Sequence, residues 1–164
     1  AILISGKAKE NRSLENTKGR VPMPLDFQYD HLILARSELR QIRVAERVVG
    51  YELPIGYPNY RGTFLSCIEA LTLEVDGAPV NKTDIRLGLN DKEFLIEDLN
   101  ELCHEYWFVR EPMTLRVFQD GGIALGEHTV RIAMTHRIPY TGYFGQYLTI
   151  HSVCEKRLFL AEGA

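Results

Sequence analysis

The fold of this chain is decided by one stretch, Leu125-Gly126-Glu127-His128-Thr129-Val130-Arg131-Ile132-Ala133-Met134. From position 128 onward, His, Val, Ile and Met take every second place, and Thr, Arg and Ala stand between them. Side chains of a β-strand point alternately to its two faces, so this pattern predicts a strand with one buried face.

Alternation of the same kind recurs over residues 49–55, 71–75, 85–89, 115–117 and 153–160. Between these segments, the pairs Asp76-Gly77, Asn90-Asp91 and Gly121-Gly122 predict tight turns. Pro54 has no backbone N–H, which places its strand at a sheet edge or at a bulge. Roughly seven short strands separated by turns indicate an all-β fold, an antiparallel β-sandwich.

The start of the deciding strand resembles the corner of immunoglobulin-like sandwiches, where a glycine precedes an inward-facing ring. His128 stands where tyrosine is usual, and we expect its ring to pack in the sheet with one nitrogen bonded to the backbone. His136 falls on the same face and is expected in the core or at an interface. The sequence therefore predicts an immunoglobulin-like sandwich that lacks the cysteine pair of antibody domains.

One short helix interrupts the strands. Its apolar side has the spacing i, i+3, i+4, i+7, made by Leu99, Leu102, Cys103 and Tyr106. Asp98 with Glu101 is similar to a capping box at the start of a helix. Trp107, at the end of this helix, is expected in the core, and His104 on its solvated side.

The length of 164 residues suits one sandwich domain, predicted over residues 37–164. Residues 1–36 form a polar N-terminal arm, which is either a frayed terminus or a segment that orders on a partner. The apolar start, residues 1–4, is too short for a signal peptide or a membrane span. The three cysteines (Cys67, Cys103, Cys154) lack metal-site spacing and are expected to be reduced, buried thiols of a cytoplasmic protein.

Groups that could carry chemistry are sparse. The formal charge of -3 with mixed signs argues against a nucleic-acid binder or a membrane-surface protein. The five histidines have neither HExxH nor HxH spacing, so no metal site is expected on this chain. Ser66 has no base nearby in the sequence, and nucleotide-binding and hydrolase motifs are absent. We expect no catalytic residue and no cofactor on this chain.

Two loops are rich in tyrosine and arginine, the residues that most often anchor interfaces. The candidate interface or substrate-covering residues are Tyr57, Tyr60, Arg61, Arg137, Tyr140 and Tyr143. Two interpretations stay open. These rings either cap the ends of the sandwich, or they form a patch that faces a partner or its substrate.

Seven short motifs between residues 37 and 161 are similar to the small (beta) subunit of the bacterial C-glycoside deglycosidases. They are Val49-Gly50-Tyr51, Tyr60-Arg61-Gly62, Leu65-Ser66-x-Ile68-Glu69, Val75-Asp76-Gly77, Asp84-Ile85-Arg86, Leu125-Gly126-Glu127-His128 and Arg137-Ile138-Pro139-Tyr140. The resemblance implies an obligate hetero-oligomer with a larger alpha subunit, a TIM barrel that holds a divalent metal, expected to be Mn²⁺.

The resemblance further implies a carbon–carbon lyase that cleaves 3-oxo-C-glucosides of aromatic, flavonoid-like aglycones. This chain would be its non-catalytic subunit, which supports and covers the metal-dependent active site. A free-standing β-sandwich that binds carbohydrate through its tyrosines is the alternative function. A metal-independent enzyme is a third possibility, and it lacks a nucleophile paired with a base in the sequence.

Overall fold

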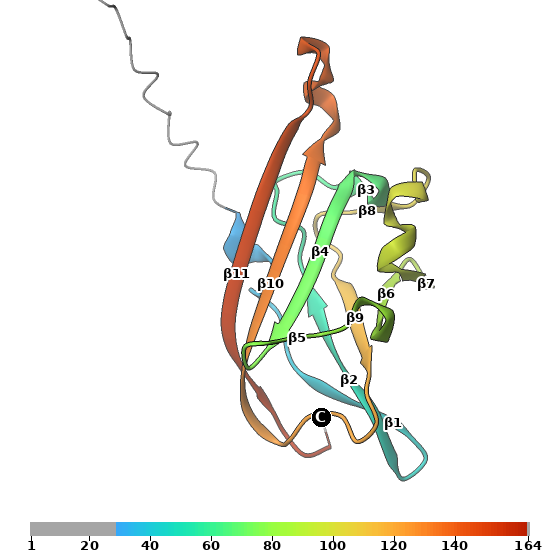
Figure 1. The fold of residues 1–164 in the computed structure, drawn as a ribbon, viewed down its shortest axis with the longest axis vertical. Helices are drawn as coiled ribbons and strands as arrows, with labels where there is room; N and C mark the ends of the chain where they lie inside the picture. Colours follow the sequence, from blue (N-terminus) through green and yellow to red (C-terminus); the bar gives the residue numbers. More distant parts are fainter. Residues whose placement is uncertain (1–28, 164) are drawn as a thin grey trace, which may run out of the picture.

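The computed structural model describes residues 29–163, with the side chain of Phe144 excepted. It confirms the predicted all-β antiparallel sandwich (Figure 1). One sheet has the strand order β1 (Arg40–Val44), β2 (Arg47–Ile55), β9 (Met113–Phe118), β6 (Ile85–Leu89) and β7 (Lys92–Leu95). The other has the order β11 (Leu148–Leu160), β10 (Gly126–Ile138), β4 (Ile68–Val75) and β5 (Ala78–Pro79). A small third sheet pairs β3 (Thr63–Phe64) with β8 (Tyr106–Trp107).

Residues 29–163 also contain five 3-10 segments: η1 (Asp30–Leu32) before the first strand, and η2 (Leu65–Cys67), η3 (Lys82–Asp84), η4 (Ile96–Glu101) and η5 (Pro139–Phe144) between strands. The expected helix around Leu99 is only the short η4, so its extent was predicted wrongly. Tyr106, assigned to that helix, lies in β8 and pairs with Phe64. Trp107 is fully buried and His104 is exposed, as expected.

The core lies between the two large sheets and follows the predicted alternation. In the deciding strand β10, Val130, Ile132 and Met134 point inward, and their neighbours are half-buried. Buried aliphatic side chains from β2, β4, β6 and β9 complete one cluster. Burying each such side chain stabilises the fold by about 1.5–3 kcal/mol, so this cluster is the main favourable contribution to stability.

The first described residues join this core. Ile33 and Leu34 are buried in it, so the packed domain includes residues before the predicted boundary at residue 37. Residues 1–28 of the predicted arm lie outside the described part of the chain. Residues near η1 also cover the outer edge of β11: Lys156 Nζ donates to the Leu34 carbonyl at 2.9 Å, and Val153 N–H donates to the Asp30 carboxylate at 3.4 Å.

The predicted turns at Asp76-Gly77 and Asn90-Asp91 are both two-residue hairpin turns. Val75 pairs with Ala78 across the first, and Asp76 and Gly77 have φ of 52° and 77°. Positive φ at both central positions is typical of the type I′ turn, which glycine and aspartate tolerate. Pro54 is not on an edge strand, because β2 pairs on both sides. It lies beyond the end of β1, where Ser37 Oγ donates to its carbonyl at 2.5 Å.

The predicted corner is confirmed at His128. Its Nε2 is 2.7 Å from the carbonyl oxygen of Ala124, and its Nδ1 is 2.6 Å from the carboxylate of Asp76. Both partners are acceptors, so both ring nitrogens can donate only when the imidazole is protonated. Burial alone would lower the pKa of His128, but the bonds to Ala124 and Asp76 outweigh it and raise the pKa.

We expect Asp76→Asn to destabilise the domain in a pH-dependent way. The contribution of protonated His128 is fully present below its ordinary pKa of 6.5, and it disappears as the pH rises through the raised pKa of the folded state. The difference in unfolding free energy between wild type and variant should therefore be larger near pH 5.5 than near pH 9. Urea unfolding at the two pH values measures it, with Asp91→Asn, in the other hairpin turn, as the control. An equal difference at both pH values would contradict a charged His128.

Candidate functional site

The two tyrosine- and arginine-rich loops meet at one end of the sandwich. The hydroxyl oxygens of Tyr60 and Tyr140 are 3.0 Å apart, although the residues are 80 positions apart in the sequence. The guanidinium carbon of Arg61 lies 5.6 Å from the centre of the Tyr140 ring, within cation–π range. We call the residues Tyr60, Arg61, Arg137, Tyr140, Tyr143 and Tyr147 the tyrosine–arginine surface. It surrounds η5, at the top of Figure 1, where β10 turns into β11.

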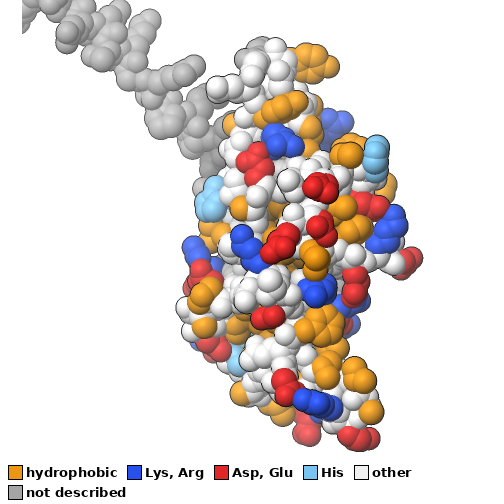
Figure 2. All heavy atoms as spheres, turned by 45° about the vertical axis from the view of Figure 1, so that its right-hand side comes forward, with side chains coloured by type: hydrophobic (Ala, Val, Ile, Leu, Met, Phe, Trp, Pro, Cys, Tyr) orange, Lys and Arg blue, Asp and Glu red, His pale blue; other side chains and the backbone are white. Residues whose placement is uncertain are grey.

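Charged side chains are spread over most of the visible face. Figure 2 shows acidic and basic side chains interspersed with apolar ones over the middle of this face and at its lower end. A face with both signs of charge carries no strong net field. The end that carries η5 is distinguished by its exposed tyrosines, Tyr60, Tyr140, Tyr143 and Tyr147.

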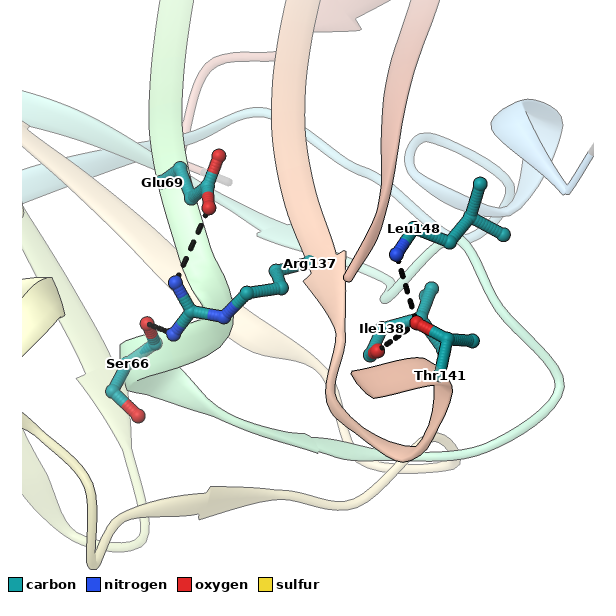
Figure 3. Close-up of polar contacts among 6 residues, drawn as sticks. All are labelled: Ser66, Glu69, Arg137, Ile138, Thr141 and Leu148. Carbon is teal, nitrogen blue, oxygen red and sulfur yellow. Dashed lines mark hydrogen bonds and ion pairs between the residues drawn. The ribbon is translucent and has the colours of Figure 1, made fainter. Parts of the chain in front are cut away.

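Arg137 holds the base of this surface in place (Figure 3). Its guanidinium donates to the Glu69 carboxylate at 3.2 Å and to the Ser66 carbonyl at 3.1 Å. Glu69 is available because it is the extra residue of a bulge in β4: Thr135 pairs with Ala70, but His136 pairs with Ile68. The same guanidinium lies 5.5 Å from the centre of the Tyr147 ring.

Thr141 closes the loop between β10 and β11 (Figure 3). Its Oγ1 donates to the Ile138 carbonyl at 2.6 Å and accepts from the Leu148 N–H at 2.8 Å. Pro139 begins η5, a position at which its fixed φ suits a helical turn. The loop therefore has a defined shape, and it carries Tyr143 at its tip with 92% of the residue exposed.

Tyr57 does not lie on this surface. Only 2% of the residue is exposed, and its hydroxyl lies 2.8 Å from Nδ1 of His136. Its ring packs against Trp107 with the ring centres 5.3 Å apart. The alternation of Leu53 and Ile55 continues inward to Tyr57, and this signal in the sequence could have placed it in the core. Tyr57 thus supports the loop that carries Tyr60 and Arg61 from below.

His136 is fully buried beneath the tyrosine–arginine surface, as its place in the alternating strand predicted. Its Nε2 lies 3.4 Å from Ser152 Oγ on β11, so the ring connects the loop after β2 to both strands of the long hairpin. Burial lowers the pKa of His136 to about 4. The imidazole is therefore neutral at physiological pH.

A second aromatic group was not predicted. The ring of Tyr106 packs edge-on against Phe64 at 5.1 Å and against Phe108 at 4.8 Å, and both phenylalanines are exposed. Gly62 lies directly beneath these rings. A side chain would not fit at this position, because a Cβ would come within 2.3 Å of the Trp107 carbonyl oxygen and 2.8 Å of the Tyr106 ring. The short sequence Arg61-Gly62 thus joins the tyrosine–arginine surface to these rings.

Within residues 29–163, no three His, Cys, Asp or Glu side chains converge as metal ligands. The described part of the chain also has no helix long and apolar enough to span a membrane. All three cysteines are free thiols. Cys67 is buried and Cys154 partly so, but Cys103 is exposed, so the expectation that it would be buried was wrong. The helix that was to bury it ends at Glu101.

We expect Thr141→Val to loosen the loop without unfolding the domain. The substitution keeps the shape of the side chain but removes two hydrogen bonds, each with a net contribution of about 1 kcal/mol. The amide of Leu148 should exchange with deuterium roughly fivefold faster or more. Thr149→Val, on an exposed threonine of the same hairpin, should leave that rate unchanged. Equal exchange in both variants would show that Thr141 does not fix the loop.

We expect His136 to make the domain less stable in mild acid. Its pKa is lower in the folded state than the ordinary 6.5, so the unfolded chain binds the additional proton as the pH falls from about 6.5 towards 4. The shift corresponds to a loss of about 1–2 kcal/mol of unfolding free energy between pH 7.5 and pH 5. His136→Gln, measured by urea unfolding, should remove this part of the pH dependence. A variant with the pH dependence of wild type would contradict it.

Comparison with known proteins gives one consistent result. A protein-family model described as C-glycoside deglycosidase beta subunit matches residues 29–140. The 3'-dehydrocarminate deglycosidase beta subunit of Microbacterium sp is 31% identical over 115 residues, which are 69% of this chain and 85% of the relative.

Two C-glycoside deglycosidase beta subunits, from Eubacterium cellulosolvens and Arthrobacter globiformis, are each 32% identical. Both matches cover 51% of this chain, and they cover 57% and 63% of those relatives, so the chain spans less than two thirds of their length. The family match begins at the first described residue and ends at Tyr140, within η5. This chain therefore belongs to the C-glycoside deglycosidase beta subunit family.

Proposed function

We propose that this chain is the non-catalytic beta subunit of a cytoplasmic bacterial C-glycoside deglycosidase and docks on a larger alpha subunit. The alpha subunit is a TIM barrel with a divalent metal, Mn²⁺, in its active site. The observation that carries the proposal is the tyrosine–arginine surface, which this member of the family exposes at one end of its sandwich. Tyrosine and arginine are enriched at the energetic centres of interfaces, because they bury large apolar area while keeping a polar group bonded.

The pair would cleave the bond between C1 of a 3-oxo-glucosyl group and an aromatic, flavonoid-like aglycone. A ketone at C3 acidifies the C2 proton, so a base can remove it. A double bond then forms between C1 and C2 as the bond from C1 to the aromatic carbon breaks, and that carbon takes up a proton. The metal would stabilise negative charge on the sugar oxygens.

The base, the acid and the metal ligands all belong on the alpha subunit in this proposal. This chain would hold the loops of the barrel around the substrate and exclude water from the reacting carbons. Arg137 and Thr141 suit this role, because they fix the shape of the η5 loop before any partner arrives.

Co-expression with a barrel alpha subunit of this family tests the proposal. We expect one stoichiometric, metal-containing complex that cleaves a 3-oxo-C-glucoside only when both chains are present. Arg61→Ala and Tyr143→Ala should weaken assembly by tenfold or more, because each removes an interface side chain. Removing the metal with a chelator should abolish cleavage but leave the two chains associated.

Arg157→Ala and Phe159→Ala are matched controls, since both residues are exposed at the opposite end of β11. They should assemble like wild type. A chain that stays monomeric beside the barrel and binds free sugar would replace the proposal with a carbohydrate-binding module. Unchanged assembly of the Arg61→Ala and Tyr143→Ala variants would show that the interface lies elsewhere.

A further inference from the structure

A cleft of about 480 Å³ lies beside the tyrosine–arginine surface, next to the paired hydroxyls of Tyr60 and Tyr140. Its walls come from four segments that are distant in the sequence: 29–30, 58–60, 138–141 and 148–152. The volume lies within the range of roughly 300–1,000 Å³ that is typical of small-molecule sites. The cleft is distinct from the exposed tip of the η5 loop, because Tyr143 does not line it.

The walls of this cleft are largely apolar and aromatic. Tyr60 and Tyr140 are 58% and 45% exposed, and Leu148 is exposed to a similar degree. The ring of Tyr29 lies tilted by 44° beside that of Tyr60, with 6.3 Å between ring centres. Apolar surface that is open to water in a concave site becomes favourable to cover, and aromatic rings favour a flat, aromatic occupant.

A few polar groups stand among these walls. The Tyr60 and Tyr140 hydroxyls can each donate or accept a hydrogen bond. Asp30 and His151 line the cleft as well. A carboxylate accepts a hydrogen bond from a phenolic hydroxyl, and sparse polar groups in an apolar cleft fix the orientation of a bound ring.

We propose that this cleft binds the aromatic aglycone, as a planar ring system with phenolic hydroxyls. This inference rests on the proposed function and deepens it, because it gives this chain a direct contact with the substrate or the released product. Tyr60 and Tyr140 supply the aromatic faces, and Asp30 accepts from a phenolic hydroxyl. A sugar alone suits the cleft less well, since its many hydroxyls would lose water against apolar walls without enough new hydrogen bonds.

Titration calorimetry on the full chain without its partner tests the cleft directly. The probes are apigenin (a planar trihydroxyflavone), its 8-C-glucoside and D-glucose. We expect saturable binding of apigenin and none of glucose. Binding of the glucoside as tight as that of apigenin would show that the cleft accepts the aglycone with its sugar attached, and tighter binding of apigenin would identify the released aglycone as the preferred occupant. Absence of apigenin binding, or binding of glucose, would overturn the inference.

Variants locate the site and separate this inference from the proposed assembly. Tyr140→Ala and Ile150→Glu alter the wall of the cleft and should weaken apigenin binding at least tenfold, with thermal melting to confirm that each variant is folded. Tyr143→Ala, the same kind of residue in the same loop, should retain apigenin binding while it weakens assembly. A chain that assembles with the barrel but binds no apigenin overturns the cleft alone. Apigenin binding without assembly supports the cleft and overturns the proposed subunit role.

Discussion

The hydrogen bond between the Tyr57 hydroxyl and Nδ1 of His136 is the constraint on which the site depends. It joins the loop that follows β2, a strand of one sheet, to β10 in the other sheet, across 79 positions of sequence. Both partners are buried, so an unpaired hydroxyl or imidazole in that place would cost about 1–3 kcal/mol. Because the loop that carries Tyr60 and Arg61 begins directly after Tyr57, its position relative to the long hairpin is fixed from inside the domain.

Residues that support the fold and residues that are exposed for binding are neighbours in the sequence, but the structure places them apart. Tyr57 and Tyr60 stand three positions apart in one tyrosine-rich loop, yet one is a structural residue and the other is exposed. Arg137 has both roles, because its guanidinium bonds Glu69 in the bulge of β4 and also lies against the exposed ring of Tyr147. A rigid frame beneath the aromatic surface reduces the conformational entropy that its loops would lose when a partner binds.

Much of the fold could be predicted from the sequence, because alternation and turn residues are local signals. The inward face of β10 was predicted from the alternation, the turns at Asp76-Gly77 and Asn90-Asp91 from their residue types, and the corner at His128 from its resemblance to the corner of immunoglobulin-like sandwiches. The helix failed because apolar residues with a period near 3.6 also occur by chance across a short turn followed by a strand. Tyr106 pairs with Phe64, and no local pattern contains that pairing. For the same reason, the meeting of Tyr60 with Tyr140 and the adjacent cleft required the structure.

The contact of η1 with β11 has a consequence for how the protein is made. Asp30 bonds Val153, 123 positions later, and Lys156 bonds the Leu34 carbonyl. During synthesis, the early residues of the domain must wait for the last strand before their packing is complete. Until then, β10 is an unpaired edge with an apolar face, the kind of surface on which nascent chains associate wrongly. Folding that depends on such distant contacts is slow, so the edge and apolar face of β10 stay exposed for longer than in a chain whose contacts are local.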